Sequence, residues 1–88
     1  MNYIDHIAEQ GGATPTEPLV FNKYPSCVAG STEDLPHPNN TNKLDWEVEL
    51  TVVIGTKCRD VDVDTAMSHV FGYTVAHDVS ARDWQLQR

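Results

Sequence analysis

Three acidic residues, Asp45, Glu47 and Glu49, alternate along one short segment of the chain and could together hold a cation. Residues two apart in an extended chain point to the same side, so these carboxylates share one face of a strand, with origins roughly 7 Å apart. Neighbouring like charges repel, and this face costs free energy unless water or a cation offsets the repulsion. Oxygen ligands suit Mg²⁺, Mn²⁺ or Ca²⁺ rather than Zn²⁺. The alternative is a polar sheet face open to water.

A second group of polar side chains follows the next apolar run. Asp78 stands between this run and a helix start, where mixed folds often place reactive carboxylates, although it could also be an ordinary turn residue. Arg82 and Gln85 lie three positions apart in the expected helix and therefore share one face. Together they would hold a carboxylate or carbonyl oxygen, unless they form only an exposed helix face.

A third candidate pair lies near the start of the sequence. His6 and Glu9 are three positions apart, which makes them neighbours on a helix. A carboxylate beside an imidazole fixes its tautomer and raises its basicity, as a general base near neutral pH requires. Such pairs also occur on helices that carry no chemistry.

The three acidic residues need a strand to display them, and the clearest periodicity in the sequence predicts one. Apolar and polar residues alternate over 45–54, which indicates a strand with one wholly apolar face. Residues 73–76 predict a second strand. Ser80 with Asp83 three residues later resembles a capping box, and predicts that a helix follows.

The remaining segments are predicted by their apolar spacing and their turn residues. A helix is expected over 3–10, where two glycines follow, and another over 63–71, with Asp62 or Asp64 as its N-cap. The apolar run 19–21 predicts a short strand. The polar segment 31–43 predicts a surface loop of a length usually tied to function.

Composition narrows the range of partners. The 88 residues include 13 Asp and Glu against 6 Lys and Arg, a net charge of -7, which is the wrong sign for binding nucleic acid. No apolar run is long enough to span a membrane, and no targeting segment is visible, so an intracellular location, mitochondrial or cytoplasmic, is expected. A chain of this length forms one domain at most.

Taken together, the motifs resemble the fumarylacetoacetate hydrolase family. The matching segments are Asn2-Tyr3-x-x-His6-x-x-Glu9, Phe21-x-Lys23, residues 44–50 (LDWEVEL), Val53-Ile54-Gly55, Gly72-Tyr73-Thr74 and residues 77–85 (HDVSARDWQ). The resemblance implies a mixed α/β, mainly β fold of curled sheets, usually dimeric. It also implies that residues 1–88 are a partial catalytic domain, because family members continue beyond the helix after Ser80 into a segment with a further lysine.

The resemblance also implies roles for the candidate residues. Glu47, Glu49 and Asp78 match the positions that hold Mg²⁺ or Mn²⁺, and His6 with Glu9 match the pair that activates water or moves a proton. Arg82 and Gln85 match substrate-binding positions. The expected function is metal-dependent chemistry on a small 2-oxo or β-diketo acid through a metal-stabilised enolate, as in an oxaloacetate tautomerase or an acylpyruvate hydrolase. The alternative is an inactive truncated product that at most binds metal or associates with a longer homologue.

Overall fold

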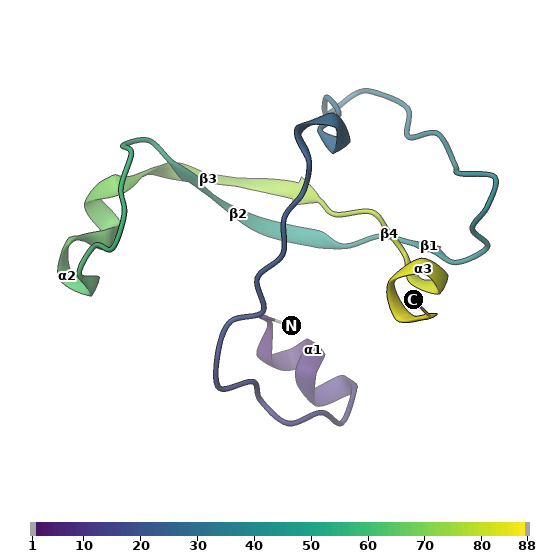
Figure 1. Ribbon diagram of the computed structural model, residues 1–88, viewed down its shortest axis with the longest axis horizontal. Coiled ribbons are helices and arrows are strands. Elements are labelled where there is room, and N and C mark those ends of the chain that lie inside the picture. The colour runs from purple at the N-terminus through teal and green to yellow at the C-terminus, as the bar shows by residue number, and fades with distance from the viewer. Residues whose placement is uncertain (1, 88) are drawn as a thin grey trace. The chain divides into compact units, whose positions relative to one another are not determined.

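The computed structural model describes residues 2–87 and divides into two compact units, Met1–Leu35 and Pro36–Arg88. Figure 1 shows the helices and strands of each unit. Helix and strand occur in about equal measure, so the mixed α/β class is confirmed, whereas the expected predominance of β structure is not. Within the described residues, no helix has the length and apolar character that a membrane crossing requires.

The first unit contains a short α-helix and a single 3-10 turn. α1 spans Ile4–Glu9, within the predicted range, and buries Ile7 to 5% exposure. Gly11 follows with a φ of 64°, a left-handed conformation that glycine adopts at no steric cost. η1 spans Pro25–Cys27. The strand predicted for residues 19–21 is wrong, because this exposed run is not paired with any strand among the described residues.

The second unit is built on an antiparallel hairpin, visible as the long pair of strands in Figure 1. β2 spans Val48–Ile54 and β3 spans Val70–His77. The ladder runs from Val48 opposite His77 to Ile54 opposite Val70, with an irregularity before Ile54. Both predicted strands are therefore present, and β3 is longer than the run that predicted it.

The hairpin connection is where the helix prediction was too long. α2 spans Val63–Ala66 and η2 spans Met67–His69, so the helical segment ends before Val70. Val70 and Phe71, which were expected on the helix, belong to β3 instead. Their β-branched and aromatic side chains favour a strand, and Val70 pairs with Ile54 of β2. Asp62 is the N-cap by position, without a side-chain cap hydrogen bond.

A second, smaller sheet adjoins the hairpin. β1, Leu44–Asp45, pairs antiparallel with β4, Ser80–Ala81, and α3 follows over Arg82–Gln87. The strand predicted for 45–54 is therefore interrupted at residues 46 and 47. The helix predicted after Ser80 is present, but the capping box is wrong, since Ser80 lies in β4 and the Asp83 carboxylate bonds to the preceding loop.

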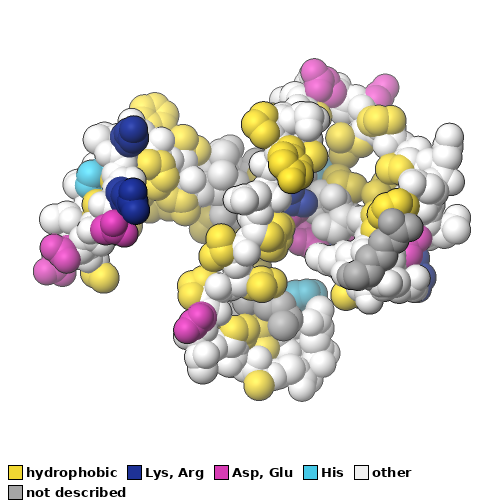
Figure 2. All heavy atoms as spheres, in the orientation of Figure 1, with side chains coloured by type: hydrophobic (Ala, Val, Ile, Leu, Met, Phe, Trp, Pro, Cys, Tyr) yellow, Lys and Arg dark blue, Asp and Glu magenta, His cyan; other side chains and the backbone are white. Residues whose placement is uncertain are grey.

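Little apolar surface is buried within the described residues. Ile7 and Thr41 are the two that fall in the buried class. The hairpin register places Leu50 opposite Val75 on the apolar face, where they are 64% and 72% exposed. Figure 2 shows hydrophobic side chains gathered at the surface of this hairpin. The hairpin is thus held by its backbone ladder and cross-strand pairs rather than by a core.

Candidate functional site

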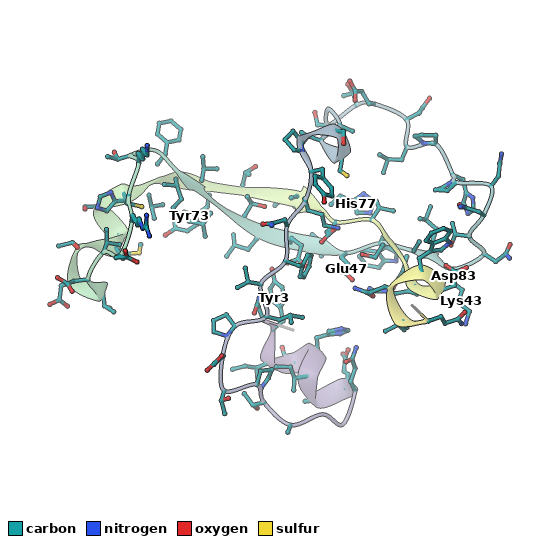
Figure 3. The ribbon with its side chains drawn as sticks, viewed as in Figure 1. Tyr3, Lys43, Glu47, Tyr73, His77 and Asp83 are labelled. Atoms are coloured by element: carbon teal, nitrogen blue, oxygen red, sulfur yellow. The ribbon has the colours of Figure 1, made fainter. Side chains whose placement is uncertain are left out.

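The predicted metal ligands lie where β1 gives way to β2. The backbone N–H of Asp78 donates to the carbonyl oxygen of Glu47 over 2.8 Å, which makes these two residues direct neighbours. Glu49 follows two positions later in β2, opposite Ala76. Figure 3 shows Glu47 at the end of the hairpin, near the start of the smaller sheet. The topology therefore places Asp78 at the end of β3 and beside the predicted acidic face.

Burial confirms that the three alternating carboxylates share a face. Asp45, Glu47 and Glu49 are half-buried, whereas the intervening Trp46 and Val48 are 71% and 62% exposed. The polar face of this segment is consequently the more sheltered one. Shelter strengthens the electrostatic field of a carboxylate, because less water is available to screen it.

Arg82 neutralises part of this acidic face. Its Nε donates to Oδ2 of Asp45 over 2.9 Å, and its Nη2 forms an ion pair with Oε1 of Glu47. Its Nη1 donates to Oε1 of Gln85 over 2.8 Å, which confirms that the two predicted substrate-binding residues share a helix face. The hydrogen bond to Asp45 raises the pKa of Arg82, and Glu47 raises it further, while burial opposes both. Arg82 is therefore a fixed cation against β1.

The donor chemistry of the acidic face fits a hard divalent cation. Glu47, Glu49 and Asp78 offer only carboxylate oxygens, which Mg²⁺ and Mn²⁺ favour, and Glu47 already pairs with a cationic group. Across residues 2–87, however, no three potential ligand side chains are gathered closely enough to enclose an ion. The assignment of these three residues as ligands stays a prediction.

His6 and Glu9 form the predicted pair on α1. Nδ1 of His6 lies 3.7 Å from Oε2 of Glu9, and both side chains are largely exposed. Sequence reasoning missed a third member, because the Gln10 amide nitrogen lies 2.9 Å from Nε2 of His6. An amide nitrogen can only donate, so this contact matches the tautomer in which Nε2 accepts and the ring proton is on Nδ1, toward Glu9. In that tautomer the lone pair lies on Nε2.

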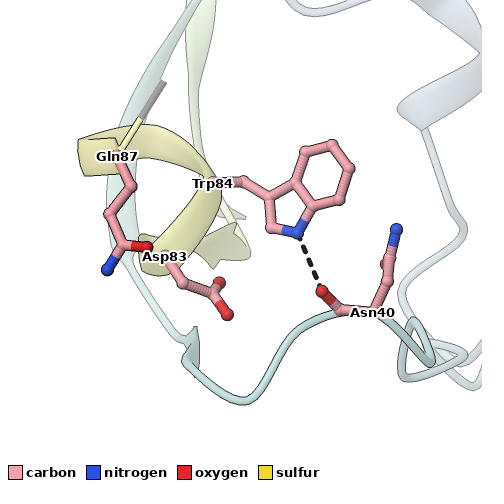
Figure 4. A pocket seen from close by; sticks show the side chains of 4 residues that line it. All are labelled: Asn40, Asp83, Trp84 and Gln87. Carbon is pink, nitrogen blue, oxygen red and sulfur yellow. Dashed lines mark hydrogen bonds between the residues drawn. The ribbon is translucent and has the colours of Figure 1, made fainter.

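Sequence reasoning also missed a cluster that joins the loop before β1 to α3. Thr41 Oγ1 donates to Oδ1 of Asp83 over 2.6 Å, and the Asn42 N–H donates to Oδ2 over 3.0 Å. The indole N–H of Trp84 donates to the carbonyl oxygen of Asn40 over 2.9 Å (Figure 4). We call these hydrogen bonds, together with those that the Lys43 backbone makes to Thr41 and Arg82, the 40–43 clasp.

Two properties distinguish the 40–43 clasp from an ordinary loop contact. Thr41 is only 3% exposed, and the hydrogen bond from its hydroxyl, followed by that from Asn42, lowers the pKa of Asp83. Asn40, Asp83, Trp84 and Gln87 line a small pocket beside it. The only signal in the sequence was the spacing of Ser80 and Asp83, which predicted a local cap, whereas the partners of Asp83 lie about forty residues away.

Comparison with known proteins identifies the chain's relatives. The whole chain, residues 1–88, matches the family described as "Fumarylacetoacetate (FAA) hydrolase C-terminal". It is 49% identical over 88 residues to the mitochondrial oxaloacetate tautomerase fahd2 of Xenopus laevis and 50% identical to the mitochondrial oxaloacetate tautomerase FAHD2A of Homo sapiens. It is also 50% identical to fumarylacetoacetate hydrolase domain-containing protein 2 of Pongo abelii.

In each of these comparisons all of this chain is aligned, and it spans 28% of the relative's length. The family match covers every candidate residue described above, from His6 to Gln85. The resemblance inferred from the motifs is therefore confirmed, and the chain belongs to the fumarylacetoacetate hydrolase family.

Proposed function

We propose that this chain forms part of an enzyme that binds Mg²⁺ or Mn²⁺ through Glu47, Glu49 and Asp78 and acts on a small 2-oxo acid. The observation that carries the proposal is the sheltered acidic face at the β1–β2 junction, which adjoins Asp78 and already holds a guanidinium. Keto–enol tautomerisation of oxaloacetate is the favoured reaction, because two relatives at about 50% identity carry that name. These relatives do not favour the inactive alternative.

The substrate-binding role falls to Arg82 and Gln85. The Arg82 guanidinium contacts the acidic face through Asp45 and Glu47, and a planar guanidinium can hold a carboxylate through two parallel hydrogen bonds. Gln85 restrains it from one side through Nη1. A bound Mg²⁺ or Mn²⁺ would supply Lewis-acid stabilisation of negative charge that develops on the substrate oxygens.

The proton-moving role falls to His6. In the tautomer selected by Glu9 and Gln10, Nε2 carries the lone pair that would accept a proton from the carbon next to the substrate carbonyl. Glu9 would stabilise the imidazolium that results, and the imidazolium would then deliver the same proton to the enolate oxygen, which completes the enol and regenerates the neutral imidazole. The Gln10 amide would have to move aside first, because it occupies Nε2 in this structure.

Metal binding tests the ligand assignment directly. Calorimetric titration of the chain with Mn²⁺ is compared with that of Glu49→Gln and of Glu17→Gln, a control at an exposed glutamate in the other unit. Loss of a carboxylate ligand should weaken Mn²⁺ binding at least tenfold in Glu49→Gln and leave Glu17→Gln unchanged. Equal binding by all three proteins would eliminate the site.

Activity tests the reaction. The rate of oxaloacetate keto–enol conversion, followed by the ultraviolet absorbance of the enol, is compared for the wild-type chain and for buffer containing the same metal. We expect a rate above the metal control that falls at least tenfold in His6→Asn. A wild-type rate equal to the metal control, in a sample that binds Mn²⁺, would rule out tautomerisation by this chain.

A further inference from the structure

We infer that Asp83 is a positioning residue for Arg82 and acts through the 40–43 clasp. The inference rests on the proposed function in one respect, which is that Arg82 binds the substrate. The Asp83 carboxylate contacts the loop before β1, where it accepts from Thr41 and Asn42. Its part is therefore to hold the first turn of α3, from which Arg82 projects.

The hydrogen bonds of the clasp close a ring around the base of Arg82. The Arg82 backbone N–H donates to the carbonyl oxygen of Lys43 over 2.8 Å, and the Lys43 N–H donates to Oγ1 of Thr41 over 3.2 Å. Thr41 in turn donates to Asp83, the residue next to Arg82. Figure 3 shows Lys43 and Asp83 together at the start of α3. Three hydrogen bonds and the peptide bond between Arg82 and Asp83 close this ring, so the loop and the helix start are joined at two points.

α3 requires such a support because it is short. It contains six residues, and an isolated helix of that length is unstable in water. The clasp bonds three consecutive residues of its first turn to the preceding loop: Arg82 through its backbone, Asp83 through its carboxylate and Trp84 through its indole. Removal of the Asp83 carboxylate would leave the buried Thr41 hydroxyl without its acceptor, which is costly, and the first turn would be released.

The spectroscopic test follows the two side-chain N–H groups that report on the clasp. In nitrogen-15 NMR spectra of the whole chain, Asp83→Ala should shift the Trp84 indole signal and speed the solvent exchange of the Arg82 Nε–H, while the β2–β3 amide signals stay in place. Thr41→Val should reproduce these changes, and Thr41→Ser should restore the wild-type spectrum because it keeps the hydroxyl. Asp34→Ala, at an exposed aspartate in the other unit, is the charge-matched control.

The binding test separates the positioning role from the proposed function. With Mn²⁺ present, affinity for oxalate, which offers adjacent oxygens as a 2-oxo acid does, should fall about fivefold to tenfold in Asp83→Ala. Affinity for Mn²⁺ alone should not fall in Asp83→Ala, because Asp83 is not among the proposed ligands.

Three results would each overturn either the positioning role of Asp83 or the proposed function. An unchanged Arg82 Nε–H signal in Asp83→Ala would overturn the positioning role, whether or not the wild-type chain binds metal. Unchanged oxalate affinity alongside normal Mn²⁺ binding would also overturn it. Failure of the wild-type chain to bind Mn²⁺ would instead overturn the proposed function, and the NMR result would then decide the positioning role alone.

Discussion

Replacement of Arg82 by alanine should tighten the binding of Mn²⁺ in the absence of substrate. The guanidinium pairs with Glu47 and donates to Asp45, so it occupies the acidic face from which we propose that a metal draws a ligand. A divalent cation that binds Glu47 must first break this ion pair. Arg82→Ala removes the competitor and leaves the carboxylates in place.

The size of the effect follows from how far the ion pair is sheltered. The side chains of Arg82 and Glu47 are each 26% exposed, so the pair lies between a fully solvated contact, worth roughly 0.2–1 kcal/mol, and a sheltered charged hydrogen bond, worth roughly 1.5–3 kcal/mol. A value of about 1 kcal/mol corresponds to about a fivefold change in dissociation constant. The same loss should lower the free energy of unfolding by about 1 kcal/mol, because Asp45 and Glu47 then repel each other without compensation.

Calorimetric titration with Mn²⁺ at pH 7 measures the change. Arg59→Ala is a matched control, because Arg59 also pairs with an aspartate, Asp60, but their side chains are 91% and 89% exposed. Both variants lose one positive charge, so the net charge of the chain changes equally in both. Only Arg82→Ala should show the additional fivefold tightening. Equal affinities in the two variants, with the β-hairpin intact by circular dichroism, would refute competition between Arg82 and the metal.

Three further outcomes follow from the described contacts. Gly55→Ala should destabilise the hairpin by about 1–3 kcal/mol in thermal unfolding, because an added Cβ would lie 2.8 Å from Cβ of Phe71. The pKa of Asp83 is lowered, so the stabilisation from the 40–43 clasp is present at neutral pH and lost as the pH falls below the ordinary aspartate value of about 3.9; the Trp84 indole NMR signal should follow that loss. Leu50→Ser should change the free energy of unfolding by less than about 1 kcal/mol, because Leu50 is 64% exposed.

The alternation of residue types predicted the central strand and the face shared by its carboxylates. It did not predict the interruption at Trp46 and Glu47, because the pairing of β1 with β4 depends on residues far along the chain. The helix prediction over 63–71 failed at Val70 for a related reason. Apolar residues continue at helical spacing through Val70 and Phe71. Val70 nevertheless pairs with β2, a distant strand that the local sequence does not indicate.

The candidate site divides in the same way. His6 with Glu9, and Arg82 with Gln85, were predictable because each pair lies within one helix turn. The carboxylate of Asp83 was predicted to form a local cap, whereas it binds Thr41. The sequence around either residue does not indicate that the other is its partner. Local periodicity therefore predicted which side chains are neighbours on an element, and missed the contacts that join distant elements.

The two faces of β2 differ in how far the described residues cover them. The apolar face, with Leu50 and Val75, remains exposed within residues 2–87, so the described segments do not bury it. The acidic face is sheltered locally, since Arg82 from α3 lies against it and the 40–43 clasp fixes the start of α3. The arrangement of Arg82 against Asp45 and Glu47 thus depends on contacts among residues 40–49 and 78–85. Cover over the apolar face should add stability to the hairpin while leaving that arrangement unchanged.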